Sequence, residues 1–206
     1  MIIEFDKVSI AYDGQKVVDN FSLSIEKGKK YALAGPSGVG KSTLLNAILG
    51  FVPISEGSLK VFGKRVCSEE IKYIRSNIGW VPQEFSLKLD SVEDLFLYPF
   101  RFSVNRKNRP SKKERDEIFK ILNLDPEMLS RSLDEISGGQ KQRFVIASQW
   151  FLKKALLLMD EPGSALDEES QDLVFDLFAQ RKDLTMLSIS HNKIWLDKMD
   201  KVIELK

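Results

Sequence analysis

A glycine-rich stretch with one lysine, GPSGVGKST at 35–43, carries the strongest chemical pattern in the chain. It satisfies G-x-x-x-x-G-K-[ST], and it follows one apolar run and opens another. Glycines let the backbone turn tightly, so its N–H groups can point inward at phosphate. Lys41 would reach the β- and γ-phosphates, and the Ser42 hydroxyl would bind Mg²⁺. The stretch predicts a site for a nucleoside triphosphate and Mg²⁺ formed by Gly35, Pro36, Ser37, Gly38, Val39, Gly40, Lys41, Ser42 and Thr43.

Two acidic residues end an apolar run later in the chain, in ALLLMDEP at 155–162. Asp160 closes the predicted strand, which would put its carboxylate beside the metal ion. Glu161 follows where a γ-phosphate would lie, and it can act as the general base for an attacking water. Two acids at the end of a buried strand are costly without a metal. The pair therefore predicts metal binding by Asp160 and water activation by Glu161.

A second glycine-containing stretch, ISGGQKQR at 136–143, also has the form of a phosphate-binding helix start. Ser137 and Gln140 have the spacing of a capping box, and an apolar helix is predicted to follow. Taken alone, the stretch fits a phosphate contact and a merely well-capped helix equally. One nucleotide needs only one such loop, so a second one has to be explained.

Hydrophobic periodicity predicts the elements that must position these residues. Two alternating segments, 2–12 and 17–28, flank an Asp13-Gly14 turn signal and predict a pair of antiparallel strands. After them, strand-like and helix-like segments alternate, which predicts a parallel sheet with right-handed crossovers. The predicted strands are 29–35, 57–63, 77–83, 155–160, 183–190 and 201–206, and the predicted helices are 41–51, 69–76, 167–182 and a short one near Lys193.

Between Gln83 and Ser137 the pattern changes to helix-like pieces without a convincing buried strand. We therefore predict a single α/β domain over 1–206, with its core at 1–82 and 148–206 and a helical lobe inserted at 83–147. The core is expected to be of the P-loop nucleotide hydrolase type, with a mainly parallel sheet and an N-terminal antiparallel β subdomain.

Composition limits what else the protein could be. The chain has 206 residues with 43% hydrophobic and 30% charged residues, which is ordinary for a globular domain. Its net charge of +1 gives no overall indication of nucleic acid or anionic lipid. Cys67 is the only cysteine, so an internal disulfide is excluded and a reducing compartment is favoured. The N-terminus is not a secretory signal, and the apolar runs are shorter than the roughly 20 residues needed to cross a bilayer.

The chain as a whole resembles the ATP-binding subunits of ABC transporters. ISGGQ is similar to the family signature LSGGQ, with Ile136 in place of leucine, and GPSGVGKST and LLLMDEP match the Walker A and Walker B motifs. VPQE places Gln83 in the Q-loop, SALD places Asp167 in the D-loop, and SISH makes His191 the switch histidine. VSIAYDG places Tyr12 where the family stacks an aromatic ring on adenine.

The resemblance implies a role for each of these residues. Tyr12 would stack on adenine, Gln83 would contact Mg²⁺ and water, and His191 would polarise the γ-phosphate and the water. Read without the family, each residue also fits a structural or surface position. The implied catalytic residues are Glu161, His191, Lys41 and Gln83, and the implied metal ligands are Ser42, Gln83 and Asp160.

The resemblance also explains the second glycine stretch. In this family the signature of one copy closes on the γ-phosphate held by the loop of another, so two chains in a head-to-tail dimer form two complete sites. The signature residues that would act across this interface are Ser137, Gly138, Gly139 and Gln140. The expected partner is a second copy or a related ATPase subunit, with ATP and Mg²⁺ as cofactors.

As the ATPase of a transporter, the chain would lie on the cytoplasmic face of the cell membrane, bound to a separate polytopic permease. The segment 86–102, SLKLDSVEDLFLYPFRF, is expected to contact that permease through exposed Phe and Leu side chains. The basic run 101–115 lacks interleaved aromatics over its later half. We interpret it as a solvated face, and no nucleic-acid partner is expected.

Two other classes of protein fit the sequence less well. Soluble ABC ATPases of DNA repair or translation usually join two halves or insert coiled coils or zinc modules, and this sequence has no heptad array or cysteine cluster. A GTPase would need N-K-x-D, whereas the Asn-Lys pair here reads NKIW with Trp195 in the place of the acid. The substrate and the direction of transport stay open. LYPFRF is faintly similar to a bacterial group linked to metal export, and lipoprotein and amino-acid systems use comparably short ATPases.

Overall fold

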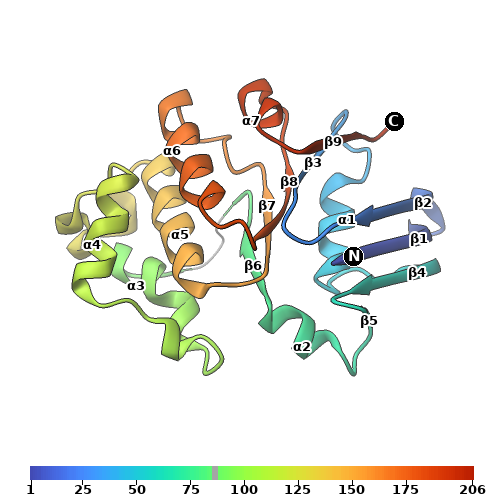
Figure 1. Ribbon diagram of the computed structural model, residues 1–206, viewed down its shortest axis with the longest axis horizontal. Coiled ribbons are helices and arrows are strands. Elements are labelled where there is room, and N and C mark those ends of the chain that lie inside the picture. Colours follow the sequence, from blue (N-terminus) through green and yellow to red (C-terminus); the bar gives the residue numbers. More distant parts are fainter. Residues whose placement is uncertain (85–87) are drawn as a thin grey trace.

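The computed structural model describes residues 1–84 and 88–206 and contains two sheets that flank helix α1 (Figure 1). The smaller sheet has the strand order β2-β1-β4-β5, and the larger has the order β6-β7-β8-β3-β9. The strands are β1 (Ile3–Tyr12), β2 (Gln15–Ile25), β3 (Lys30–Ala34), β4 (Glu56–Val61), β5 (Lys64–Arg65), β6 (Ile78–Val81), β7 (Leu156–Asp160), β8 (Thr185–Ile189) and β9 (Lys201–Glu204). The helices are α1 (Lys41–Ile48), α2 (Ile71–Ser76), α3 (Val92–Leu97), α4 (Lys112–Ile121), α5 (Gly138–Leu152), α6 (Glu168–Ala179) and α7 (Lys193–Asp197).

The small sheet is antiparallel and begins with the predicted hairpin. Asp13 and Gly14 both have positive φ, at 49° and 81°, and they join Tyr12 to its cross-strand partner Gln15. Two central residues with positive φ define the turn whose twist suits a two-residue hairpin loop, and Asp-Gly is favoured there. The predicted pair of antiparallel strands is confirmed.

The large sheet is parallel in all four of its pairings, as the alternation of strands and helices predicted. β4 differs from that expectation, because it joins the antiparallel sheet through its pairing of Val61 with Ile3 of β1. The order of elements along the chain could not indicate which of two sheets a strand would join.

Two hydrophobic cores lie on the two sides of the large sheet. On one side, α1 packs between the sheets, and its Leu44, Leu45 and Ile48 are fully buried. On the other side, α5 and α6 cover the sheet, and α3 packs on α5 (Figure 1). Both faces of the parallel strands are therefore buried, which explains the nearly continuous apolar sequence of β7.

The described part of 83–147 contains helices and 3₁₀ turns and no strand, in agreement with the predicted helical lobe. Helix α5 passes through the boundary proposed at 147 and joins the lobe to the core. Within residues 1–84 and 88–206, no helix is both long and apolar enough to cross a membrane.

The prediction that 86–102 presents exposed Phe and Leu side chains is mostly wrong. Leu95, Phe96 and Phe100 are buried because this face of α3 packs on α5. Phe102 is exposed, and Leu87 lies outside the described residues. The spacing of apolar residues shows that a helix has an apolar face. It does not show whether that face packs inside the lobe or binds a partner.

The aromatic cluster around Phe96 should be the main source of the lobe's stability. The ring is 1% exposed and lies 5.1 Å from the Phe119 ring and 6.2 Å from the Phe151 ring. We expect Phe96→Ala to lower the free energy of unfolding by about 3–5 kcal/mol, measured by urea denaturation. The matched control Phe102→Ala should change it by no more than about 1 kcal/mol. Equal losses would contradict this assignment of the core.

Candidate nucleotide-binding site

The phosphate loop lies between β3 and α1, as its sequence predicts. Gly40 takes the N-cap position of α1 without a side-chain cap, so the first N–H groups of the helix remain available. Lys41 is 6% exposed, and its Nζ donates hydrogen bonds of 2.8 Å to the carbonyls of Gly35 and Pro36. The loop therefore holds its lysine over its own backbone, where a phosphate would bind.

Two loop glycines are required by close packing as well as by their conformation. Gly35 has φ +138°, and a Cβ there would lie 2.5 Å from the carbonyl oxygen of Leu205. Gly40 has φ +97°, and a Cβ there would lie 2.8 Å from Cγ2 of Val18. The loop is thus packed between β2 and the segment after β9, and only glycine fits at these positions.

The remaining residues of the stretch form the tip of the loop and the start of α1. Pro36, Ser37 and Gly38 are exposed at the tip, and Val39 and Thr43 are half-buried. The whole stretch therefore lies on one surface at the carboxyl end of β3, where ligands of parallel sheets bind.

The ends of β7 and β8 bring Glu161 and His191 together. Asp160 pairs in register with Ile189, so the residues after the two strands leave the sheet at the same edge. The His191 Nε2 atom lies 3.4 Å from the Glu161 Oε1 atom, and both side chains are partly exposed. Glu161 has φ +48°, an uncommon conformation for a non-glycine residue, and its N–H donates to Ile189 O at 3.0 Å.

Asp160 is a buried carboxylate that lacks a full set of partners. It is 8% exposed, and its Oδ1 atom accepts no hydrogen bond from the described residues. Burial raises the pKa of the Asp160 carboxyl, a hydrogen bond from Ser42 lowers it, the charge of Glu161 raises it, and the charge of Lys41 lowers it. Carboxylate and hydroxyl oxygens are hard donors of the type that Mg²⁺ prefers. Asp160 and Ser42 therefore fit a Mg²⁺ ion, which would satisfy the unpaired oxygen.

Tyr12 and Gln83 are placed at strand ends, as expected. Tyr12 ends β1 and is 46% exposed. Gln83 is exposed two residues after the end of β6, a neighbour of β7 in the sheet. Among the described residues, neither forms a side-chain hydrogen bond or ion pair that would fix its direction.

The signature stretch lies at the N-terminus of α5, and its capping box is present. The Ser137 Oγ atom accepts from Gln140 N at 3.2 Å, and Ser137 N donates to the Gln140 side chain at 2.8 Å. Ser137 and Gly138 are exposed, whereas a Cβ on Gly139 would lie 2.6 Å from Ala165 O in the loop after β7. Within the described residues, no hydrogen bond joins this stretch to the phosphate loop. The Gly139 end of the stretch packs instead on the loop after β7.

Two glutamines that the sequence did not single out hold the backbone between these motifs. Gln142 Nε2 donates to Glu161 O at 3.4 Å, and Gln171 Nε2 donates to Gly163 O at 3.3 Å and Leu166 O at 3.0 Å. A Cβ at Gly163 would lie 2.9 Å from Cδ of Gln171, so the Gln171 side chain packs directly on this glycine. These contacts join separate elements, so no local pattern could reveal them.

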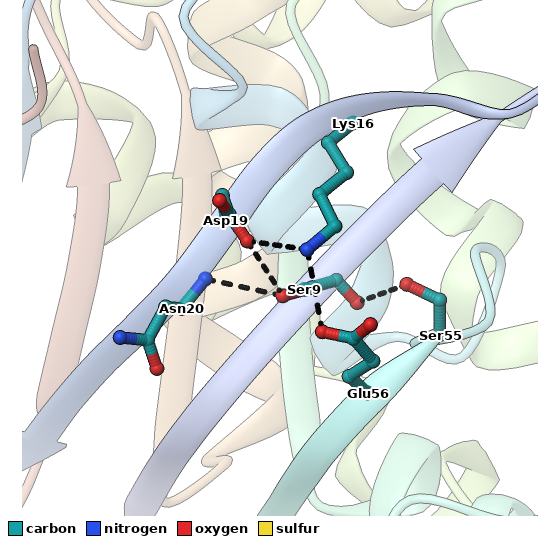
Figure 2. Close-up of polar contacts among 6 residues, drawn as sticks. All are labelled: Ser9, Lys16, Asp19, Asn20, Ser55 and Glu56. Atoms are coloured by element: carbon teal, nitrogen blue, oxygen red, sulfur yellow. Dashed lines mark hydrogen bonds and ion pairs between the residues drawn. The ribbon is translucent and has the colours of Figure 1, made fainter.

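A polar network in the small sheet supports the hairpin that carries Tyr12 (Figure 2). Ser9 is 1% exposed, and its Oγ donates to Asp19 Oδ1 at 3.1 Å. Lys16 Nζ bridges Asp19 at 2.8 Å and Glu56 at 3.4 Å, which ties β2 to β4 across β1. The hydrogen bond from Lys16 is the largest cause that lowers the pKa of the Asp19 carboxyl. The network fixes β2, whose Val18 packs against the phosphate loop.

Comparison with known proteins identifies the family. The family model of the ABC transporter matches residues 18–164, which include the phosphate loop, the signature stretch and the acid pair. The chain belongs to the ABC transporter family. As an ABC ATPase, it binds ATP and hydrolyses it.

Relatives of this ABC ATPase include ATP-binding proteins of several transport systems. It is 32% identical to the ergothioneine transport ATP-binding protein EgtV of Helicobacter pylori (strain G27), over 100% of this chain and 97% of that protein. It is 31% identical to the manganese transport system ATP-binding protein MntB of Bacillus subtilis (strain 168), over 92% of this chain and 77% of that protein.

Two solved structures share the fold of this ABC ATPase. A bacterial Atm1-family ABC exporter with ATP bound matches with a TM-score of 0.86 and 25% identity, over 99% of this chain and 37% of that chain. A dimeric ATP-binding cassette in a post-hydrolysis state with ADP and Pi matches with a TM-score of 0.83 and 26% identity, over 99% and 94% of the two chains. These matches confirm the P-loop core with its antiparallel and helical parts.

The unpaired charge of Asp160 should make the nucleotide-free protein less stable at neutral pH. Folding raises the pKa of this carboxyl above its ordinary value of 3.8, so the carboxylate costs stability above the folded-state pKa, and the cost fades as the pH falls. We expect Asp160→Asn to raise the free energy of unfolding at pH 7 by about 1 kcal/mol. Urea denaturation over a pH series, with chelator present, should show the gain shrinking towards pH 3.8.

Asp167→Asn is the matched control, because the hydrogen bond from Ser170 lowers the pKa of the Asp167 carboxyl. This residue caps α6, and its substitution should not raise stability at any pH. A gain for Asp167→Asn, or none for Asp160→Asn, would contradict the assignment of an unpaired carboxylate.

Proposed function

We propose that this ABC ATPase is the ATP-binding subunit of a transporter and works as a head-to-tail dimer on a separate membrane subunit at the cytoplasmic face of the membrane. The observation that carries the proposal is the division of the chain into two half-sites. The phosphate loop, Asp160, Glu161 and His191 lie around the carboxyl ends of neighbouring strands, whereas the signature stretch is exposed at the start of α5.

In the proposed reaction, each group of the first half-site has a distinct task. Lys41 and the N-terminus of α1 hold the β- and γ-phosphates. Ser42, Asp160 and Gln83 would hold Mg²⁺, which would neutralise phosphate charge. Glu161 accepts the proton of the attacking water. His191, 3.4 Å from Glu161, orients that water and the γ-phosphate, and Tyr12 stacks on adenine.

The second half-site is proposed to act on the nucleotide of the partner copy. Ser137 and Gly138 are exposed, and the capping box already orders the first turn of α5. The capping box uses the N–H groups of Ser137 and Gln140, so the Ser137 hydroxyl, the Gln140 amide NH₂ and the N–H groups of Gly138 and Gly139 are the groups that would meet a γ-phosphate. Two copies related by a two-fold axis complete both sites. The dimeric state of the ADP- and Pi-bound relative supports this arrangement.

An apolar groove beside Gln83 is the proposed contact with the membrane subunit. The groove has a volume of about 270 Å³ and lies between the core and the lobe. Its lining includes Trp80 and Pro82 from the core side and Tyr98 and Phe102 from the lobe. A helix of the permease seated there would adjoin both the Q-loop and the lobe. Relatives named for transport of ergothioneine and manganese support a transport role but leave the substrate and its direction open.

Glu161→Gln tests the hydrolytic half of the proposal. The amide keeps the size of the side chain but cannot accept the proton of water. We expect this variant to bind ATP, to cut turnover by at least about 10²-fold, and to accumulate as a dimer with ATP and Mg²⁺. Phosphate release measures the turnover, and light scattering after gel filtration measures the dimer.

The double variant Glu161→Gln/Ser137→Arg is the control for dimer formation. Arginine at this exposed position should block closure while the phosphate loop still binds ATP. A double variant that dimerised on ATP would contradict the two-half-site arrangement. Normal hydrolysis by Glu161→Gln alone would remove Glu161 from its proposed role.

The membrane subunit can be identified by co-purification. We expect tagged Glu161→Gln, isolated with ATP from gently solubilised membranes, to retain a polytopic membrane protein, because the trapped dimer stays in its ATP-bound form. Mass spectrometry of the bound proteins then indicates the substrate class. Recovery of only soluble or ribosomal partners would instead favour an ABC ATPase of DNA repair or translation.

A further inference from the structure

Positive charge is concentrated in one short segment, 101–113, which we call the basic segment. It contains six of the 31 lysines and arginines of the chain and none of the 30 aspartates and glutamates. The other residues therefore hold 25 basic against 30 acidic side chains, a net charge of −5. The six cations are Arg101, Arg106, Lys107, Arg109, Lys112 and Lys113. A nearly neutral chain thus carries one strongly basic segment, although Glu93 and Asp94 line the same hollow as three of its arginines.

The basic segment combines these cations with exposed apolar side chains. All six cations are exposed, and in the described part of the chain only Arg101 forms an ion pair, with Asp94. Phe102 is 51% exposed, and Val104 is 49% exposed. Apolar side chains among cations match the headgroup region of an anionic bilayer, where the apolar groups enter and the cations bind phosphate.

The basic segment is folded and anchored, unlike a loose charged tail. Asn105 is 8% exposed; it donates to Pro99 O at 2.9 Å and accepts from Lys154 Nζ at 2.5 Å. Asn108 donates to Leu152 O at 2.9 Å. These bonds fasten the segment, which joins α3 to α4, to the carboxyl end of α5 (Figure 1). The backbone that carries the cations is thus held in place before any ligand binds, which lowers the entropy lost on binding.

The basic segment is continuous with the groove proposed for the membrane subunit. Phe102 and Asn105 belong to the segment, and Tyr98 and Pro99 precede it; all four line the groove. A permease helix seated in the groove would hold the segment next to the bilayer surface. We propose that the basic segment binds the anionic headgroups of membrane phospholipids. The proposed function provides the membrane that the segment meets, but lipid binding itself is testable with the isolated chain.

The test is sedimentation of the purified, nucleotide-free chain with sucrose-loaded vesicles. We expect binding to vesicles of phosphatidylcholine with phosphatidylglycerol and none to phosphatidylcholine alone. Arg106→Gln/Lys107→Gln/Arg109→Gln should weaken partitioning to vesicles on the order of 10²-fold. Each cation near an anionic surface strengthens binding by a similar factor, and three such factors multiply to that value. Added salt should weaken the binding of the natural chain.

Lys27→Gln/Lys72→Gln/Lys182→Gln is the matched control, since it removes the same charge from other exposed positions. This control should keep vesicle binding, and both triple variants should keep the natural rate of ATP hydrolysis. Equal loss in both variants, or no binding of the natural chain, would overturn the proposal. If the natural chain did not bind vesicles and the Arg106→Gln/Lys107→Gln/Arg109→Gln variant no longer co-purified the membrane subunit, the segment would instead bind an acidic protein surface. Failure of Glu161→Gln to dimerise would count against the proposed function and leave the vesicle result unaffected.

Discussion

Parallel hydrogen bonding among β3, β8 and β7 is the constraint on which the nucleotide site depends. Leu33 pairs with Ile189, and Ile189 pairs with Asp160, so three strands end at one level. Segments that are far apart along the chain therefore leave the sheet at the same edge. A slip in this register would separate the phosphate loop from Glu161 and His191, whatever their sequences.

The same site concentrates features that oppose stability. Asp160 is buried with an unpaired oxygen, and Glu161 has a left-handed backbone. Each of these costs of the order of 1–3 kcal/mol in proteins, so the surrounding structure has to hold them in place. The two hydrophobic cores on the faces of the large sheet provide that support. The site is thus poised for a ligand with phosphate and metal charges, which would satisfy these groups.

The helical lobe has a buried face that packs in the core and an exposed face that is free for contacts. The inner face of α3 and the ring of Phe96 belong to the core, whereas Phe102 and the cations that follow it face outward. Helix α5 begins at the signature stretch and ends where the basic segment is anchored. One helix therefore joins the surface that would meet the second ATPase copy to the surface that would meet the membrane.

The sequence by itself indicated ATP hydrolysis and most of the elements. Tight turns, helix caps and phosphate loops depend on neighbours in the chain, so Gly40, Ser137 and the Asp13-Gly14 turn could be assigned from local patterns. Only the tertiary structure decided that β4 joins the antiparallel sheet and that Leu95, Phe96 and Phe100 face the core. It also decided that Gln142 and Gln171 hold the backbone of the acid pair and the D-loop. Each of these outcomes is set by contacts between distant segments, and an apolar or polar side chain does not encode which distant partner it will meet.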